Sequence, residues 1–546
     1  MCTFIFMVKR LLFLNLLLTM SCSERADLIL YNADIYTLNK DFENATSFAV
    51  KDGKFVYVGN DNVLSKFTSS NIINAEGLPV FPGFIDSHAH FYNLGFFNNQ
   101  VDLNDTKSFE EVVKKVIDFD RVNQKEFIIG RGWDQNDWDK KVFPTNKLLN
   151  ESFPDKPVVL RRVDGHAYLV NDYALSMAGI NINSEIPGGE FVKLNNKLTG
   201  VLIDNSMELI NNIIPSPTME ESIKALLTAQ EIAFENGLTT ISEAGISKDQ
   251  IDLIDSLQRN GSLKIRIYAM INNGPDVDLY IKQGPYKTDR LNVRSVKVYA
   301  DGALGSRGAS MINEYSDKKG YFGIIRTPID SINALAFKLA GTKFQMNTHA
   351  IGDNANRFVL NSYREALFNF RDPRWRIEHA QVINENDIDL FNQKIIPSVQ
   401  PTHATSDMYW LYDRIGKKRA NYAYAYKTLL EKSSIIAFGT DFPVEDVNPI
   451  MTFYSAIARK DKNGFPDEGF QMENSINRTD ALNAMTIFGA YANFEENEKG
   501  SIEVGKFADF VILDNDIIKS TEVRIPLTNV VATFLNGELV FNRRYN

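Results

Sequence analysis

Two histidines separated by a single residue, His88 and His90, end the apolar stretch FPGFIDSHAH. Alternate residues of a β-strand point to the same side, so both imidazoles can reach one point in space. Such a pair fits two roles, half of a metal site or ordinary polar residues where a strand meets a loop. The chain has only six histidines, so the remaining ones can be used to decide between the two roles.

Three further polar residues also follow short apolar stretches. His349 closes KFQMNTHA, His379 closes RWRIEHA and Asp441 closes SIIAFGTD. Imidazole and carboxylate groups are the ligands that a divalent ion such as zinc accepts at a site without cysteine. One buried histidine with a backbone partner would be common, but four histidines and an aspartate in this arrangement indicate a shared metal site.

The elements that must position these residues alternate along the middle of the chain. Short apolar runs such as LTTISEA and RSVKVYADG are separated by helical stretches, for example TMEESIKALLTAQEIAFENG with Gly237 as its stop signal. Repeated strand–helix units predict a parallel sheet, either a barrel or a doubly wound sheet. The sequence lacks the glycine-rich phosphate turns of nucleotide-binding folds. We therefore predict an α/β fold, a (β/α)8 barrel of the TIM type, with the ligands at the carboxyl ends of its strands.

The length of the chain predicts more than a plain barrel. Residues 81–490 far exceed the roughly 250 residues that a barrel needs, so we expect an insertion at about residues 92–217. Alternating β-type runs occur at both ends, in residues 23–80 and 491–546, and NGE in the second suggests a hairpin. Because chain termini often lie close together, the two ends are predicted to form one small β-sandwich.

The first 22 residues predict a secretory signal. Lys9 and Arg10 precede LLFLNLLLTMSC, an apolar stretch too short to span a bilayer comfortably. Cys22 at its end resembles the acylated residue of a bacterial lipoprotein, although Thr19 departs from the leucine usual at that position. We expect an exported protein of the periplasm or cell envelope, with a lipid anchor at Cys22 if the residue is acylated. The alternative is an apolar amino-terminal helix on a cytosolic protein.

The composition of the chain limits which classes of cofactor and partner are expected. The only cysteines, Cys2 and Cys22, lie in this leader, so the mature protein would have neither a disulfide nor a thiolate metal ligand. The formal charge is 59 minus 69, or −10, which argues against a nucleic-acid partner. We expect a small-molecule substrate, and the sequence does not predict an oligomeric state.

The motifs together resemble a known family. PGFIDSHAH, the histidine of HAIGD, the histidine of RIEHA and the aspartate of GTDFPVE resemble the amidohydrolase superfamily, and more narrowly its amidohydrolase-3 or YtcJ-like branch, which includes N-substituted formamide deformylases. GKFADFVILD and VKDGKFVYVG resemble the small β-sandwich of that family. The resemblance implies a metal-bearing barrel with one or two divalent ions, usually zinc.

The resemblance also implies roles for individual residues. His88 and His90 would hold the more buried metal, and His349 and His379 the second. Asp441 would bind metal and act as the catalytic base. Lys297, in VKVYADGALGSR, resembles the lysine that bridges two metals after carboxylation. A lysine buried beside cations loses its proton readily, which agrees with that role, although SVKVY would also suit a plain strand with a solvated lysine.

Five further residues are candidates for substrate binding. His166 lies in VDGHAYLVN, which resembles a segment of the family that reaches into the substrate pocket. The others end or follow strand-like runs in the barrel region: Glu243, Asp301, Arg307 and His403. Each also has a structural reading, a loop contact, a salt bridge or a group supporting a metal ligand.

The predicted function follows from this set of residues. We expect a metal-dependent amidohydrolase that cleaves a carbon–nitrogen bond other than a peptide bond, an amide or N-formyl group, through a metal-activated water. A hydrolase of esters or cyclic amides would use the same chemistry. A non-catalytic solute-binding surface protein is the alternative from another class, but it would not need every ligand and the base.

Overall fold

The computed structural model describes residues 23–60 and 62–543. The predicted signal, residues 1–22 with Cys22, lies outside the described residues, so the expected export and lipid anchor are not tested. Among the described residues, no helix combines the length and apolar character that a membrane span requires.

Eight parallel strands form a nearly closed barrel, which confirms the predicted fold class. Several of them are buried at every position, as expected when both faces of a parallel sheet are covered. A short strand, β19 (Tyr286–Lys287), pairs antiparallel with one of the eight. In spatial order the barrel strands are β10 (Phe84–Ala89), β17 (Leu238–Ile246), β18 (Arg266–Asn272), β20 (Leu291–Tyr299), β21 (Gln345–Ala350), β22 (Trp375–His379), β23 (Ile395–Val399) and β24 (Ala437–Phe438).

Helices surround the barrel strands and begin at recognisable caps. Thr218 and Glu221 form a capping box at the start of α8, and Gly237 follows its end with φ +79, as the stop signal predicted. Ser247 and Gln250 repeat the capping box in α9. The helices of this region are α3 (Phe91–Leu94), α8 (Met219–Glu235), α9 (Lys248–Arg259), α10 (Asp276–Gln283), α11 (Ile329–Ala340), α12 (Asp353–Ala366), α13 (Pro401–Asp407), α14 (Leu411–Ala420), α15 (Tyr426–Ser433), α16 (Pro449–Ala458), α17 (Arg478–Ala484) and α18 (Ile487–Ala492).

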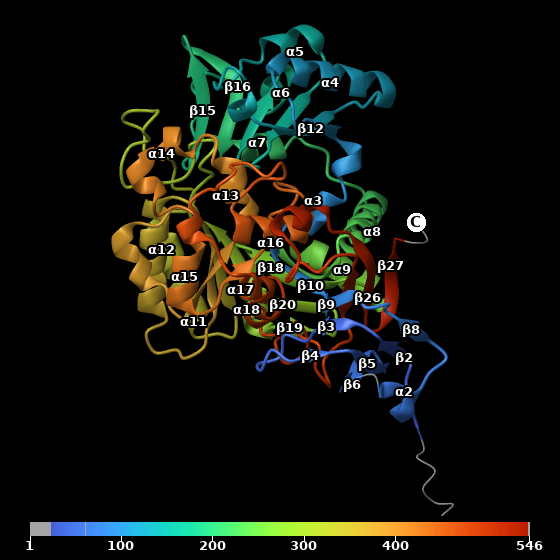
Figure 1. Cartoon of the computed structure of the whole chain (residues 1–546). Coiled ribbons are helices and arrows are strands. Elements are labelled where there is room, and N and C mark those ends of the chain that lie inside the picture. The colour runs from blue at the N-terminus through green and yellow to red at the C-terminus, as the bar shows by residue number, and fades with distance from the viewer. Residues whose placement is uncertain (1–22, 61, 544–546) are drawn as a thin grey trace, which may run out of the picture.

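The segment predicted as an insertion contains a six-stranded sheet of its own, which lies above one end of the barrel in Figure 1. Two helices, α4 (Phe109–Asn123) and α5 (Lys147–Ser152), pack on one face of the sheet, and α6 (Asp172–Met177) and α7 (Met207–Asn211) pack on the other. The strands in spatial order are β11 (Val101–Asp102), β12 (Ile128–Trp133), β13 (Val158–Arg162), β14 (Ala167–Val170), β16 (Lys197–Asp204) and β15 (Gly189–Leu194).

Both ends of the described chain meet in a β-sandwich, seen as blue and red strands in Figure 1. Phe510 pairs with Pro82 between β25 and β9, and its ring lies 4.8 Å from that of Phe48 in the other sheet. The predicted NGE hairpin is confirmed, since Asn536 and Gly537 turn with positive φ between β26 and β27. One sheet has the order β6 (Lys54–Gly59), β5 (Ser47–Lys51), β2 (Leu28–Tyr31) and β8 (Ile72–Asn74); the other has β27 (Glu538–Asn542), β26 (Val530–Leu535), β25 (Phe510–Leu513), β9 (Pro79–Pro82), β3 (Asp34–Tyr36) and β4 (Asn44–Ala45).

Candidate metal centre

The first and last barrel strands meet where the candidate ligands lie. The backbone N–H of Asp441 donates to the carbonyl of His88, and the N–H of His90 donates to the carbonyl of Phe442, both at 2.8 Å. Gly439 allows this approach, because a Cβ at that position would lie 2.5 Å from the backbone nitrogen of His88. His88, His90 and Asp441 are thereby brought together although more than 350 residues separate them in sequence.

Three side chains form a compact group at this point. Ligand atoms of His88, His379 and Asp441 all lie within 4.8 Å of one another, and all three residues are buried. His90 lies beside the group, with its Nε2 atom 3.3 Å from Asp441 Oδ1. His349, on β21, has its ring 4.5 Å from that of His379. The structure therefore brings the four predicted histidines and the aspartate to one site, at the carboxyl ends of the strands.

Neighbouring side chains orient two of the imidazoles. His88 Nδ1 is 2.5 Å from Glu378 Oε2, and His379 Nδ1 is 2.8 Å from the side-chain oxygen Oε1 of Gln400. Since Nδ1 donates to an oxygen in each case, Nε2 keeps a free lone pair. A histidine held in this tautomer by a second group is typical of metal ligands.

The charges of the group also suit a metal. Burial lowers the pKa of His88, brings that of His90 down to about 4, and takes those of His349 and His379 well below the usual value, so the rings are neutral near pH 7. Burial opposes ionisation of Asp441, but His403 and His90 hold its pKa well below the usual range.

A buried oxygen of Asp441 provides the test of whether a cation fits. Its Oδ1 atom accepts no hydrogen bond from any described residue, and it faces His88 Nε2 at 3.7 Å and His90 Nε2 at 3.3 Å. A buried carboxylate oxygen without a donor is costly unless a cation binds it. Neutral imidazoles around an ionised carboxylate are the donors that zinc prefers, so the site fits a divalent metal.

Lys297 lies at the same centre. It is buried on β20, and its Nζ atom is 3.2 Å from His88 Nε2 and 4.9 Å from the centre of the Tyr299 ring. Within the described residues no carboxylate lies within 4.0 Å of Nζ, and burial lowers its pKa to about 8. The solvated lysine weighed as the alternative does not match this placement.

His403 and His166 approach the centre from two different parts of the chain. His403, in α13 after β23, places Nε2 3.4 Å from Asp441 Oδ2 and Nδ1 2.9 Å from Glu445 Oε1. His166 lies in the turn between β13 and β14 of the inserted sheet, with its ring 4.9 Å from that of His349. Its Nδ1 atom is 2.6 Å from Asp204 Oδ1. Both histidines are therefore fixed by a carboxylate while facing the candidate ligands.

The other three substrate candidates make contacts within the protein. Asp301 is buried and accepts hydrogen bonds from three backbone amides, and one of its oxygens lies 3.6 Å from His349 Nε2. Arg307 pairs with Asp317 at 2.8 Å. Glu243 is also buried and accepts from the backbone N–H groups of Phe91 and Tyr92. These contacts lie within the protein and do not show a surface for substrate.

Several residues of the site were not predicted from the sequence. Glu378 binds His88, and Arg376 forms a buried ion pair with Glu378 at 2.8 Å. Asp86 accepts from Thr440 Oγ1 at 2.7 Å and so joins β10 to the loop after β24. The available signal was the pair of charged residues two apart in WRIEH, which must share one face of a buried strand.

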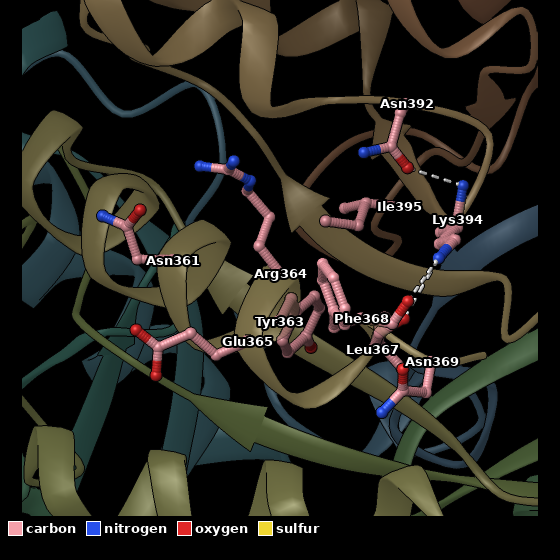
Figure 2. A pocket seen from close by; sticks show the side chains of 10 residues that line it. All are labelled: Asn361, Tyr363, Arg364, Glu365, Leu367, Phe368, Asn369, Asn392, Lys394 and Ile395. Carbon is pink, nitrogen blue, oxygen red and sulfur yellow. Dashed lines mark hydrogen bonds between the residues drawn. The ribbon is translucent and has the colours of Figure 1, made fainter.

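The hollow drawn in Figure 2 lies elsewhere on the molecule. It has a volume of about 730 Å³ and lies between the end of α12 and the start of β23. Lys394 Nζ donates there to the carbonyls of Leu367 and Phe368, at 3.1 and 3.4 Å. Since it adjoins the amino end of β23, this hollow is at the opposite end of the barrel from the ligands, and none of the predicted site residues lines it.

Comparisons with known proteins find similarity to amidohydrolases. The sequence model of the Amidohydrolase family matches residues 71–541. Protein LONG AFTER FAR-RED 3 of Arabidopsis thaliana is 31% identical over 94% of this chain and 92% of its own length. "Putative amidohydrolase YtcJ" of Bacillus subtilis is 29% identical over 93% and 98%, and an N-substituted formamide deformylase of Arthrobacter pascens is 21% identical over 95% and 99%.

A solved structure shares the same architecture. An uncharacterized metal-dependent hydrolase from Pyrococcus horikoshii superposes with a TM-score of 0.73 and 27% identity. The match covers 91% of this chain and 99% of that structure. The similarity thus includes the barrel, the inserted sheet and the sandwich.

Proposed function

The chain belongs to the amidohydrolase family, and we propose that its metal centre hydrolyses a carbon–nitrogen bond other than a peptide bond, in an amide or N-formyl group. That it is a metal-dependent hydrolase of this family rests on the family match and on the relatives described above. The similarity to an N-substituted formamide deformylase supports the choice of bond. The observation that carries the proposal is the ionised Asp441 with a free buried oxygen among neutral imidazoles.

The proposed ligands are His88, His90, His349 and His379, together with Asp441 and a carboxylated Lys297. Imidazole and carboxylate donors favour zinc. A bound divalent metal would lower the pKa of water and polarise the scissile carbonyl.

Asp441 is the proposed base. Its pKa lies well below the usual range, so it is ionised near pH 7 and can take a proton from the attacking water. The same carboxyl group can then deliver that proton to the leaving amine. His403 lies 3.4 Å from Oδ2 and, although burial opposes protonation, Asp441 and Glu445 raise its pKa to about 10. A cation beside Oδ2 leaves Oδ1 facing His88 and His90, and His166, whose ring is 4.9 Å from that of His349, is placed to contact substrate.

Turnover of a panel of N-acyl and N-formyl amines by metal-replete protein tests the proposal. We expect hydrolysis that a chelator abolishes and added zinc restores. Asp441→Asn should reduce kcat by at least about 1,000-fold, because the base is lost while the shape of the site is kept. Asp446→Asn, an exposed residue of the same loop, is the matched control and should keep full activity.

Three outcomes would contradict the proposal. Undiminished activity of Asp441→Asn would show that Asp441 is not the base. If the protein hydrolyses only esters or cyclic amides and releases no amine from the panel, the metal chemistry of the proposal stands and the proposed bond is wrong. Absence of turnover on every class at full metal occupancy would favour a solute-binding protein.

A further inference from the structure

Two arginines lie side by side at the ends of neighbouring strands in the inserted sheet. Arg131 on β12 and Arg161 on β13 are register partners in a parallel pair. Side chains at partner positions of adjacent strands project from the same face of the sheet. The two guanidinium groups are therefore placed together, close to where β13 leads into the turn that carries His166.

Neither arginine forms an ion pair within the described part of the chain. Arg131 is only 7% exposed, yet its one hydrogen bond runs from Nη2 to the carbonyl of Val163 at 3.0 Å, and its buried Nε atom has no partner. Arg161 donates only to the carbonyl of Gly165, at 3.2 and 3.3 Å. No carboxylate lies within 4.0 Å of either group among residues 23–60 and 62–543.

Other buried arginines of the chain differ in their partners: Arg459 donates to the carbonyls of Phe470 and Tyr424 and has no carboxylate partner among the described residues, whereas others have one. Arg162, the next residue along β13, pairs with Asp134 and Asp164, and Arg376 pairs with Glu378. A buried cation without a counter-ion is costly, and a carboxylate group of a ligand would offset that cost. Arg161 is half-buried and adds a second positive charge at the adjacent position, which makes the cost larger.

The two arginines lie within electrostatic reach of the metal centre. Burial and, to a smaller extent, the neighbouring Arg161 lower the pKa of Arg131 to about 9, although Asp441 opposes this shift. Arg161 and Asp441 both act on Tyr299, whose ring is 5.4 Å from that of His349. Residues 163–166, which follow Arg161, are partly exposed, so this side of the centre is open to solvent.

We propose that Arg131 and Arg161 form a subsite for a carboxylate group of the substrate, next to the metal centre. Guanidinium groups bind carboxylates through paired, charge-assisted hydrogen bonds, and the buried Nε of Arg131 has no partner among the described residues. Asp441 and Asp164 already offset part of the positive charge, which favours a singly charged carboxylate over a phosphate. The substrate class is then an N-acyl or N-formyl amino acid, an inference that rests on the proposed function.

Binding without turnover provides the first test. The probes are matched pairs of an N-formyl amino acid and the N-formyl amine that lacks only its carboxylate, with aliphatic, aromatic and polar side chains. Titration calorimetry on the Asp441→Asn protein should show that the carboxylate member binds at least about tenfold more tightly in the best pairs. No preference in any pair, or tighter binding of inorganic phosphate than of N-formyl amino acids, would overturn the proposal.

Substitution of Arg161 provides the second test. In Arg161→Gln we expect the affinity for the carboxylate member to fall about 10- to 100-fold more than that for the neutral member. Arg161→Lys, which keeps the charge but not the paired donors, should recover part of the loss. Arg259→Gln, an arginine on the surface of α9 with a 66% exposed side chain, is the control. Equal losses on both members of a pair would assign Arg161 a structural role and contradict the subsite.

These results separate the subsite from the proposed function. If carboxylate-dependent binding is found but the metal-replete enzyme hydrolyses no N-acyl or N-formyl compound, the subsite stands and the assigned bond is wrong. If neutral amides are hydrolysed without any preference for a carboxylate, the function stands and the subsite is wrong.

Discussion

Glu378 fixes the direction in which His88 presents its free nitrogen. The carboxylate receives His88 Nδ1 at 2.5 Å on one oxygen and Arg376 at 2.8 Å on the other, and all three side chains are fully buried. Arg376 also donates to Ser398 Oγ at 3.0 Å, which fixes the guanidinium group beside the carboxylate. A metal at the centre would therefore find His88 Nε2 already oriented.

Replacing Glu378 by glutamine tests this positioning role. The amide keeps the size of the side chain but removes the charge that holds His88 and balances Arg376. We expect metal affinity to fall about 10- to 100-fold, measured by competition with a chelator, as is usual when the partner of a metal-binding histidine is removed. Exposed Glu385→Gln is the control. An unchanged affinity in Glu378→Gln would show that His88 needs no such support.

Lys297 gives a prediction about metal stoichiometry. If its amine is carboxylated and bridges two ions, the replete protein should contain about two metal equivalents, and Lys297→Ala should retain about one. Elemental analysis measures the content. Lys287→Ala, which removes a partly exposed lysine paired with Glu498 far from the centre in the fold, is the matched control and should keep both equivalents. Two equivalents in Lys297→Ala would rule out the bridge.

At this scale, sequence spacing predicts the candidate ligands but not the residues around them. His88, His349 and His379 end apolar runs, and the ends of parallel strands converge in a barrel, so their meeting could be predicted. Glu378 and Arg131 could not be recognised in the same way. Their importance depends on which atoms contact a partner and which have none, and this is fixed only when distant strands pack.

At the scale of elements, short sequence signals predicted the ends of helices and hairpins, because residues close together in sequence determine these ends. The capping box and Gly237 delimit α8, and Asn536–Gly537 delimits the last hairpin. The inserted sheet was expected only as an interruption of the barrel. Its strands pair in an order that differs from their order in sequence, with β14 beside β16, and such pairing depends on packing between segments far apart.

Glu243 links two elements of the barrel, and its effect on the stability of the protein depends on pH. Its carboxylate on β17 accepts from the first backbone N–H groups of α3, yet burial raises its pKa from 4.5 to about 8. Because the folded protein binds the proton more tightly than the unfolded chain, wild-type stability falls as the pH rises from about 4.5 to 8.

Glu243→Gln should remove that pH dependence, since the amide oxygen can accept the same N–H groups without a charge. The stability of the variant relative to the wild type should increase with pH in this window, by at most about 1.4 kcal/mol per pH unit. Urea unfolding of metal-free protein at pH 5 and pH 8 measures the difference. Glu235→Gln at the end of α8 is an exposed control. A constant difference at both pH values would contradict the shifted pKa.

At the scale of the whole molecule, a buried ion pair joins the sandwich to the barrel. Arg266 on β18 donates to both oxygens of Asp509, at 2.6 and 2.9 Å, and both residues are almost fully buried. The ring of Phe507 lies 3.9 Å from the same guanidinium group. A second pair, Lys264 with Glu538, crosses the same boundary on the surface. The chain thus offers a buried and an exposed ion pair at one interface.

The two ion pairs should differ greatly in how much each contributes to the free energy of unfolding. Asp509→Asn leaves Arg266 buried without a counter-charge, and we expect a loss of about 3–5 kcal/mol in the free energy of unfolding. Glu538→Gln breaks an exposed pair and should cost no more than about 1 kcal/mol. The double variant Arg266→Met with Asp509→Leu removes both buried charges and should recover most of the loss. Urea unfolding followed by circular dichroism measures all three, and equal costs for the two single variants would show that the buried pair does not hold the sandwich to the barrel.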